Sequence, residues 1–114
     1  MKSMKLVILF GLAAMLLTAC GQSDNDSGKV TLKQAPDEVA SIYKSSCIGC
    51  HATDLSGKIG DKTDIQLVFE RLSYEEIIEA IMQGGDTMPS FKDSLTEEEI
   101  NGLAAWLSKQ QQVE

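Results

Sequence analysis

Cys47-Ile48-Gly49-Cys50-His51 is the stretch of the sequence that decides the fold. Two cysteines separated by two residues, with a histidine directly after the second, form the attachment signature of a c-type haem. The spacing places the thiols about one helical turn apart, so both can bond covalently to the vinyl groups of one porphyrin. The imidazole of His51 can then bind the haem iron. The motif therefore predicts one covalent haem c per chain.

Two other kinds of site share this cysteine spacing. A thioredoxin-like redox dithiol needs a βαβ context, which the sequence does not show. Half of a zinc site needs a second pair of ligands. The chain has one histidine and three cysteines, so only Cys20 remains outside the motif. A haem site is the interpretation that uses the whole motif, and a lipoprotein with an incidental C-x-x-C-H is the remaining alternative.

Residues 1–19 are typical of an export signal. Lys2 and Lys5 flank the start of an apolar run over residues 6–17, which is shorter than the roughly 20 residues of a transmembrane helix. The run leads into Leu17-Thr18-Ala19-Cys20, which resembles a bacterial lipobox. We therefore expect a lipoprotein signal peptide over 1–19 and a lipid on Cys20. An ordinary signal peptide that ends near a cysteine is the alternative.

The stretch after Cys20 is small, polar and acidic over residues 21–28, as in a flexible tether. We expect the lipidated cysteine and tether to occupy residues 20–35 and the folded domain residues 36–110. The formal charge of −7 would become −9 without residues 1–19, because Lys2 and Lys5 leave and no acid does. This charge disfavours nucleic acid as a partner. It could steer a basic electron-transfer partner, or simply belong to a solvated surface.

Helical periodicity follows on both sides of the motif. Pro36 and the acids after it predict the start of a helix whose apolar face leads to Cys47. Asp64 could cap a second, short helix, with apolar residues at helical spacing from Ile65 to Leu72. The members of that apolar set are Ile65, Val68, Phe69 and Leu72.

Two capping boxes predict the remaining helices. Ser73 with Glu76 opens a helix that should stop at Gly84-Gly85, and Thr96 with Glu99 opens the last one. No stretch of the sequence predicts a strand, a repeat or a second domain. The expected fold class is therefore all-α, with four to five short helices around one covalent haem.

The second iron ligand must be something other than histidine, because His51 is the only histidine. Methionine is the next candidate. Met88 precedes Pro89 in a loop after the predicted Gly-Gly helix stop, and proline biases the residue before it toward an extended backbone. Met82 is the rival, but its phase places it on the buried face of a helix. We expect His51 and Met88 to be the axial ligands.

The motifs together resemble those of small class I cytochromes c, and more narrowly the lipid-anchored short cytochromes c of Gram-positive bacteria. The matching parts are the lipobox, Cys47-Ile48-Gly49-Cys50-His51, Met88-Pro89, and a final helix with Trp106. The family usually has Gly-Pro after the haem motif, where a carbonyl accepts the proton of the other imidazole nitrogen. The corresponding region here reads Lys58-Ile59-Gly60-Asp61, so the sequence does not identify the carbonyl that orients His51.

The resemblance implies an electron carrier rather than an enzyme. The expected protein carries single electrons between respiratory complexes, such as a quinol-oxidising reductase and a terminal oxidase. It would be a monomer held on the outer face of the cytoplasmic membrane by the lipid on Cys20. The alternative is a haem protein with an open sixth site, either an enzyme or a ligand sensor.

Overall fold

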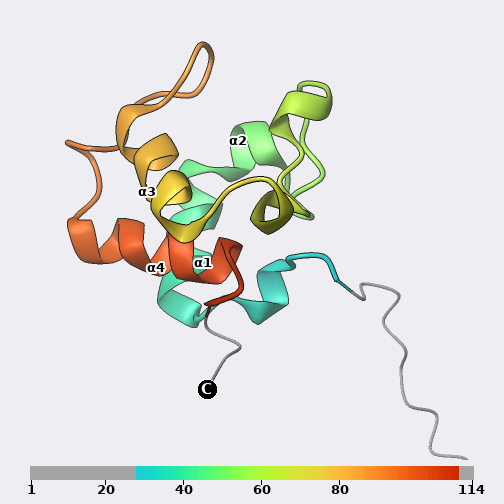
Figure 1. Cartoon of the computed structure of the whole chain (residues 1–114), viewed down its shortest axis with the longest axis horizontal. Helices are drawn as coiled ribbons and strands as arrows, with labels where there is room; N and C mark the ends of the chain where they lie inside the picture. The colour runs from blue at the N-terminus through green and yellow to red at the C-terminus, as the bar shows by residue number, and fades with distance from the viewer. Residues whose placement is uncertain (1–27, 111–114) are drawn as a thin grey trace, which may run out of the picture.

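The computed structural model describes residues 28–110, all of whose regular elements are helical (Figure 1). The four α-helices and three 3₁₀ turns are, in order, η2 (Leu32–Gln34), α1 (Asp37–Ser46), α2 (Ile48–His51), η3 (Asp61–Thr63), η4 (Val68–Glu70), α3 (Tyr74–Gln83) and α4 (Glu97–Leu107). No strand occurs in this range, which confirms the predicted all-α class. None of its helices has the length and apolar character of a membrane span. The predicted signal and lipobox lie outside the described residues.

The first and last α-helices pack across one another, as Figure 1 shows. Gly102 of α4 lies so close to α1 that a Cβ there would be 3.1 Å from Cγ2 of Val39. The rings of Tyr43 and Trp106 meet edge to face at a centroid distance of 5.3 Å, a favoured aromatic geometry. The Trp106 indole also donates a hydrogen bond of 3.0 Å to the Thr31 carbonyl. This crossing fixes α1, and with it the start of the haem motif.

Both predicted capping boxes are present. The Ser73 hydroxyl accepts from the Glu76 amide at 3.2 Å, and the Glu76 carboxylate accepts from the Ser73 amide at 2.8 Å. Thr96 and Glu99 repeat the same pair of bonds at 3.2 and 2.8 Å. The helix that Ser73 opens ends at Gly84, as predicted, with φ of +69°.

The predicted helix from Ile65 to Leu72 is wrong; only the turn η4 forms there. Its backbone groups bond to other segments instead. The Ile65 amide donates to the Leu55 carbonyl at 2.9 Å, and the Gln66 carbonyl accepts from Val30 at 2.8 Å. Asp64 accepts from the Gln66 amide at 2.9 Å, which closes a local turn rather than capping a helix. These contacts with distant segments outweigh the helical periodicity.

The packed part of the chain also begins earlier than the expected boundary at residue 36. Val30 is buried, and its amide donates the bond to Gln66 just described. Residues 32–34 form η2. Residues 30–35, which were expected to belong to the tether, therefore lie against the domain.

Candidate haem site

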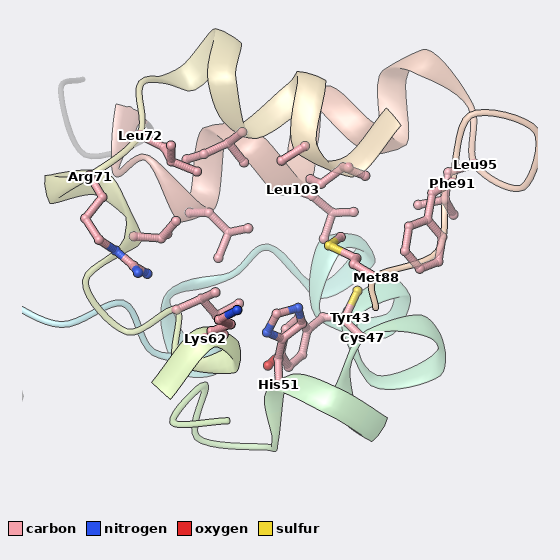
Figure 2. Close-up of a pocket in the computed structure, with 16 residues that line it drawn as sticks. Tyr43, Cys47, His51, Lys62, Arg71, Leu72, Met88, Phe91, Leu95 and Leu103 are labelled. Atoms are coloured by element: carbon pink, nitrogen blue, oxygen red, sulfur yellow. The ribbon is translucent and has the colours of Figure 1, made fainter. Parts of the chain in front are cut away.

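A cavity of about 380 Å³ opens between α1, α2, α3, α4 and the loops that join them (Figure 2). Its walls are mainly aliphatic and aromatic. The lining residues are Tyr43, Cys47, His51, Lys62, Ile65, Val68, Arg71, Leu72, Ile77, Ala80, Ile81, Met88, Phe91, Leu95, Leu103 and Leu107. An apolar cavity with a few polar groups at its margin is the usual form of a cofactor site.

Short helix α2 carries the end of the haem motif. Cys47 occupies its N-cap position, half-buried against the cavity, and His51 is its last residue, with the ring directed into the cavity (Figure 2). Cys50 is exposed and is not among the lining residues. The Tyr43 hydroxyl donates a 2.6 Å hydrogen bond to the carbonyl of Ala52, directly after α2. Helix α1 therefore holds α2 from both ends, through the chain at Cys47 and through Tyr43.

The carbonyl that accepts a hydrogen bond from His51 belongs to Thr63. Nδ1 of His51 lies 2.8 Å from this oxygen, so Nδ1 carries the proton, and in the neutral ring Nε2 is the nitrogen that can bind a metal. The sequence region expected to provide this carbonyl ended at Asp61. The acceptor lies two residues further on, at the end of η3. No local sequence pattern could have identified it.

Met88 reaches the cavity from the loop that follows α3 (Figure 2). Its carbonyl accepts from the Gly85 amide at 2.9 Å, and the Phe91 amide donates to Ile81 at 3.0 Å. The first bond closes a turn within the loop, and the second ties the loop to α3. Met82 is partly buried but is not among the residues lining the cavity. The geometry thus brings Met88, and not its rival, to the same cavity as His51.

Two cations, Lys62 and Arg71, lie on the side of the cavity away from Cys47 and Met88 (Figure 2). Arg71 also donates to the Asp64 carbonyl at 2.9 Å, which fixes its side chain beside the cavity. A porphyrin of the haem type carries two propionates on the edge remote from its vinyl groups. The cations therefore suit the propionates, while the Cys47 thiol on the opposite side suits a vinyl group. Neither residue was identified from the sequence, because a single cation outside a motif carries no signal.

The alternative of a redox dithiol fits the site poorly. Burial, together with the nearby Cys50 thiol, raises the pKa of Cys47 to about 11. A nucleophilic redox cysteine needs a lowered pKa, because the thiolate is the reactive form. A zinc site fits no better, since residues 28–110 hold no cluster of three or more potential metal-binding His, Cys, Asp or Glu side chains. An imidazole and a thioether facing an apolar cavity, with the Cys47 thiol beside it, define the site of a haem protein.

Comparisons with known proteins agree with this class. The family model described as "Cytochrome C oxidase, cbb3-type, subunit III" matches residues 34–107. Cytochrome c-551 of Bacillus subtilis (strain 168) is 32% identical over 114 residues, which cover 96% of this chain and 98% of the relative. Cytochrome c-550 of the same organism is 30% identical over 91 residues, covering 80% of this chain and 70% of the relative.

A solved structure shares the fold. Cytochrome c6C from Synechococcus sp. PCC 7002 superposes with a TM-score of 0.56 at 24% identity, over 68% of this chain and 99% of that one. The chain belongs to the small class I c-type cytochromes. It is a single-haem electron carrier with covalent haem c, and not an enzyme.

Proposed function

We propose that this cytochrome is anchored to the outer face of the cytoplasmic membrane through a lipid on Cys20. It carries single electrons there between a quinol-oxidising reductase and a terminal oxidase. The support for the anchor is the lipobox that follows an apolar signal run. Two or three acyl chains are enough for stable anchoring. Residues 20 to about 27 then act as the tether.

The proposal assigns a role to each residue of the site. Cys47 and Cys50 bind the haem covalently, His51 is the proximal iron ligand and Met88 the distal one. Bound haem supplies an iron that gains and loses one electron. The protein contributes two fixed ligands and apolar walls that exclude water. It also contributes the cations Lys62 and Arg71, which would pair with the propionates. The observation that carries this function is the convergence of His51 and Met88 on one apolar cavity (Figure 2).

The decisive experiment combines covalent haem staining with spectroscopy of the exported protein. A stained band on a denaturing gel should disappear in a Cys47→Ala/Cys50→Ala variant. The ferric protein should show a methionine-to-iron charge-transfer band, and the ferrous protein should bind carbon monoxide slowly or not at all. Met88→Leu should abolish the band and allow rapid carbon monoxide binding, whereas Met82→Leu should do neither.

Other outcomes separate the alternatives. An unstained wild-type band would show that the C-x-x-C-H is incidental. Rapid carbon monoxide binding by the wild type would instead favour the open sixth site of an enzyme or sensor. Loss of the band in Met82→Leu alone would move the distal ligand from Met88 to Met82.

The anchor has its own test. Labelled fatty acid should be incorporated into the wild type, which should sediment with membranes. Cys20→Ala should take up no label and be released in soluble form with its haem attached. Membrane association unchanged in Cys20→Ala would contradict the lipid anchor without affecting the haem assignment.

A further inference from the structure

The loop that runs from α2 through η3 contains one buried polar side chain, that of Thr63. Thr63 is the single buried polar or charged residue among those the structure describes, with only 8% of its surface exposed. Its hydroxyl donates to the Gly60 carbonyl at 2.9 Å and accepts from the Ile59 amide at 3.1 Å. The hydroxyl thus uses both its donor and its acceptor capacity inside the loop.

The absence of a side chain at Gly57 makes room for Thr63. A Cβ at Gly57 would lie 2.7 Å from the Thr63 carbonyl carbon and 2.8 Å from the Asp64 nitrogen. The φ of Gly57 is +86°, which L side chains rarely adopt. The Gly57 amide donates to the His51 carbonyl at 2.9 Å, and the Lys58 amide donates to Cys50 at 2.9 Å. These two bonds tie the first half of the loop that carries Thr63 to α2.

The other end of the loop returns to the same helix through the histidine ring. The Thr63 carbonyl accepts the Nδ1 proton of His51 at 2.8 Å. The loop contains no proline that would hold this carbonyl in place, since Pro36 and Pro89 are the chain's two prolines. Two backbone bonds close the turn that carries this carbonyl, from the Thr63 amide to the Gly60 carbonyl at 3.2 Å and from the Asp64 amide to the Asp61 carbonyl at 3.3 Å. The side-chain bonds of Thr63 to Gly60 and Ile59 add to them. Thr63 thus provides both the carbonyl that accepts the His51 proton and a hydroxyl whose bonds help to hold that carbonyl in position.

We propose that the Thr63 hydroxyl is a positioning group that sets the strength of the His51 Nδ1–H bond and, through it, the reduction potential of the haem. The inference rests on the proposed ligation of iron by His51. A strong bond from Nδ1 to a carbonyl makes the imidazole a more basic ligand, which stabilises ferric over ferrous iron. Without the hydroxyl, the Thr63 carbonyl is held less firmly. Its hydrogen bond to His51 Nδ1 therefore weakens, and the reduction potential of the haem rises.

The test compares three variants of the haem-loaded protein. Thr63→Val keeps the shape of the side chain but removes the hydroxyl, and Thr63→Ser keeps the hydroxyl. Thr53→Val is the matched control, because Thr53 is exposed. The readouts are the reduction potential and the exchange rate of the His51 Nδ1 proton in nuclear magnetic resonance spectra.

Thr63→Val should shift the equilibrium toward ferrous iron by about tenfold, equal to ~59 mV for a one-electron couple. Its Nδ1 proton should exchange at least tenfold faster. Thr63→Ser should restore most of both values, and Thr53→Val should match the wild type. Equal values for Thr63→Val and Thr53→Val, or no rescue by serine, would overturn the proposal.

Gly57→Ala offers a second route to the same result, because its methyl group would displace Thr63 while the hydroxyl is retained. It should raise the potential and speed proton exchange in the same direction as Thr63→Val. An unchanged reduction potential and exchange rate in a folded Gly57→Ala protein would also contradict the positioning role of the Thr63 hydroxyl. Failure of the proposed haem ligation is distinguishable, since the wild type itself would then lack the spectrum of a His–Met haem.

Discussion

At the scale of single residues, Tyr43 links three parts of the site. Its hydroxyl donates to the carbonyl of Ala52 at the end of α2, its side chain lines the cavity, and its ring packs edge to face with that of Trp106. Tyr43→Phe removes only the hydroxyl and leaves the Ala52 carbonyl without this partner. We expect a loss of about 1–2 kcal/mol in the free energy of unfolding, measured by denaturant titration of the haem-loaded protein. Tyr74→Phe, at a half-buried tyrosine, is the control and should cost less.

The same residue predicts a dependence of stability on pH. Burial, the largest cause, raises the pKa of Tyr43 above its ordinary value; the Cys47 thiol and Asp54 add to this. The thiol's contribution ends once Cys47 is a thioether, but burial remains. The unfolded chain releases the phenol proton near pH 10, whereas the folded protein keeps it. Above about pH 10 the unfolded state therefore binds fewer protons, and the free energy of unfolding falls as pH rises.

Denaturant titrations at about pH 9 and about pH 11 test this dependence. The wild type should lose more stability between the two values than Tyr43→Phe, which has no phenol to ionise at this position. Equal losses in the two proteins would show that ionisation of Tyr43 does not cause the fall in the free energy of unfolding at alkaline pH.

The roles of single residues differ in how far the sequence reveals them. The motif and the lone histidine were enough to single out Cys47, His51 and Met88, and all three line the cavity. Thr63 could not be found in this way. Its carbonyl is a backbone group, and backbone groups at a site depend on how distant segments fold together. The roles of Cys47, Cys50, His51 and Met88 as ligands remain predictions for the experiments above.

At the scale of elements, the end of α3 determines where the Met88 loop starts. Gly84 has φ of +69°, and a Cβ there would lie 2.8 Å from both the Pro89 carbonyl carbon and the Ser90 nitrogen. Gly84→Ala should cost about 1–3 kcal/mol and displace the loop, so that the methionine-to-iron band weakens. Gly85→Ala is the matched control, because its Cβ would meet nothing within 4 Å. An intact band in Gly84→Ala would show that the loop does not depend on this turn.

The capping boxes predict helix stability separately from the haem ligands. Ser73→Ala and Thr96→Ala each remove a hydroxyl that accepts from a first-turn amide. Each should lower the free energy of unfolding by about 1 kcal/mol with no change in the visible spectrum. Thr87→Ala, at an exposed loop position, should have a smaller effect. A spectral change in either capping variant would connect the helix starts to the iron, contrary to this expectation.

Local signals therefore predicted the elements that depend on local bonds. The capping boxes and Gly84 act within a few residues, and α3 and α4 form where these signals place them. The stretch from Ile65 to Leu72 shows the opposite case. Its apolar spacing is helical, but its backbone bonds to Leu55 and Val30. The spacing predicted which side chains face the core better than it predicted the backbone.

At the scale of the whole molecule, the cavity makes the fold dependent on its cofactor. Apolar side chains of α1, α3, α4 and the segments between them line a space of about 380 Å³, and a domain of this size is only marginally stable on its own core. Cys47→Ala/Cys50→Ala should prevent haem attachment and leave a chain with reduced helical circular dichroism and no cooperative melting. Cys20→Ala, which keeps the haem cysteines, should melt like the wild type. Cooperative unfolding of the haem-free variant would contradict this dependence.

The hydrogen bond from Trp106 to Thr31 has a consequence for the path of the chain. With the bond that Lys109 donates to the Gly28 carbonyl, it makes the polypeptide of the domain almost a closed ring. A short peptide joining Gln110 to Gly28 would complete the ring. New ends could then be cut in the exposed stretch at residues 92–94, between Met88 and α4. Such a circular permutant would begin with the helix that now comes last, and His51 and Met88 would keep their places around the same cavity.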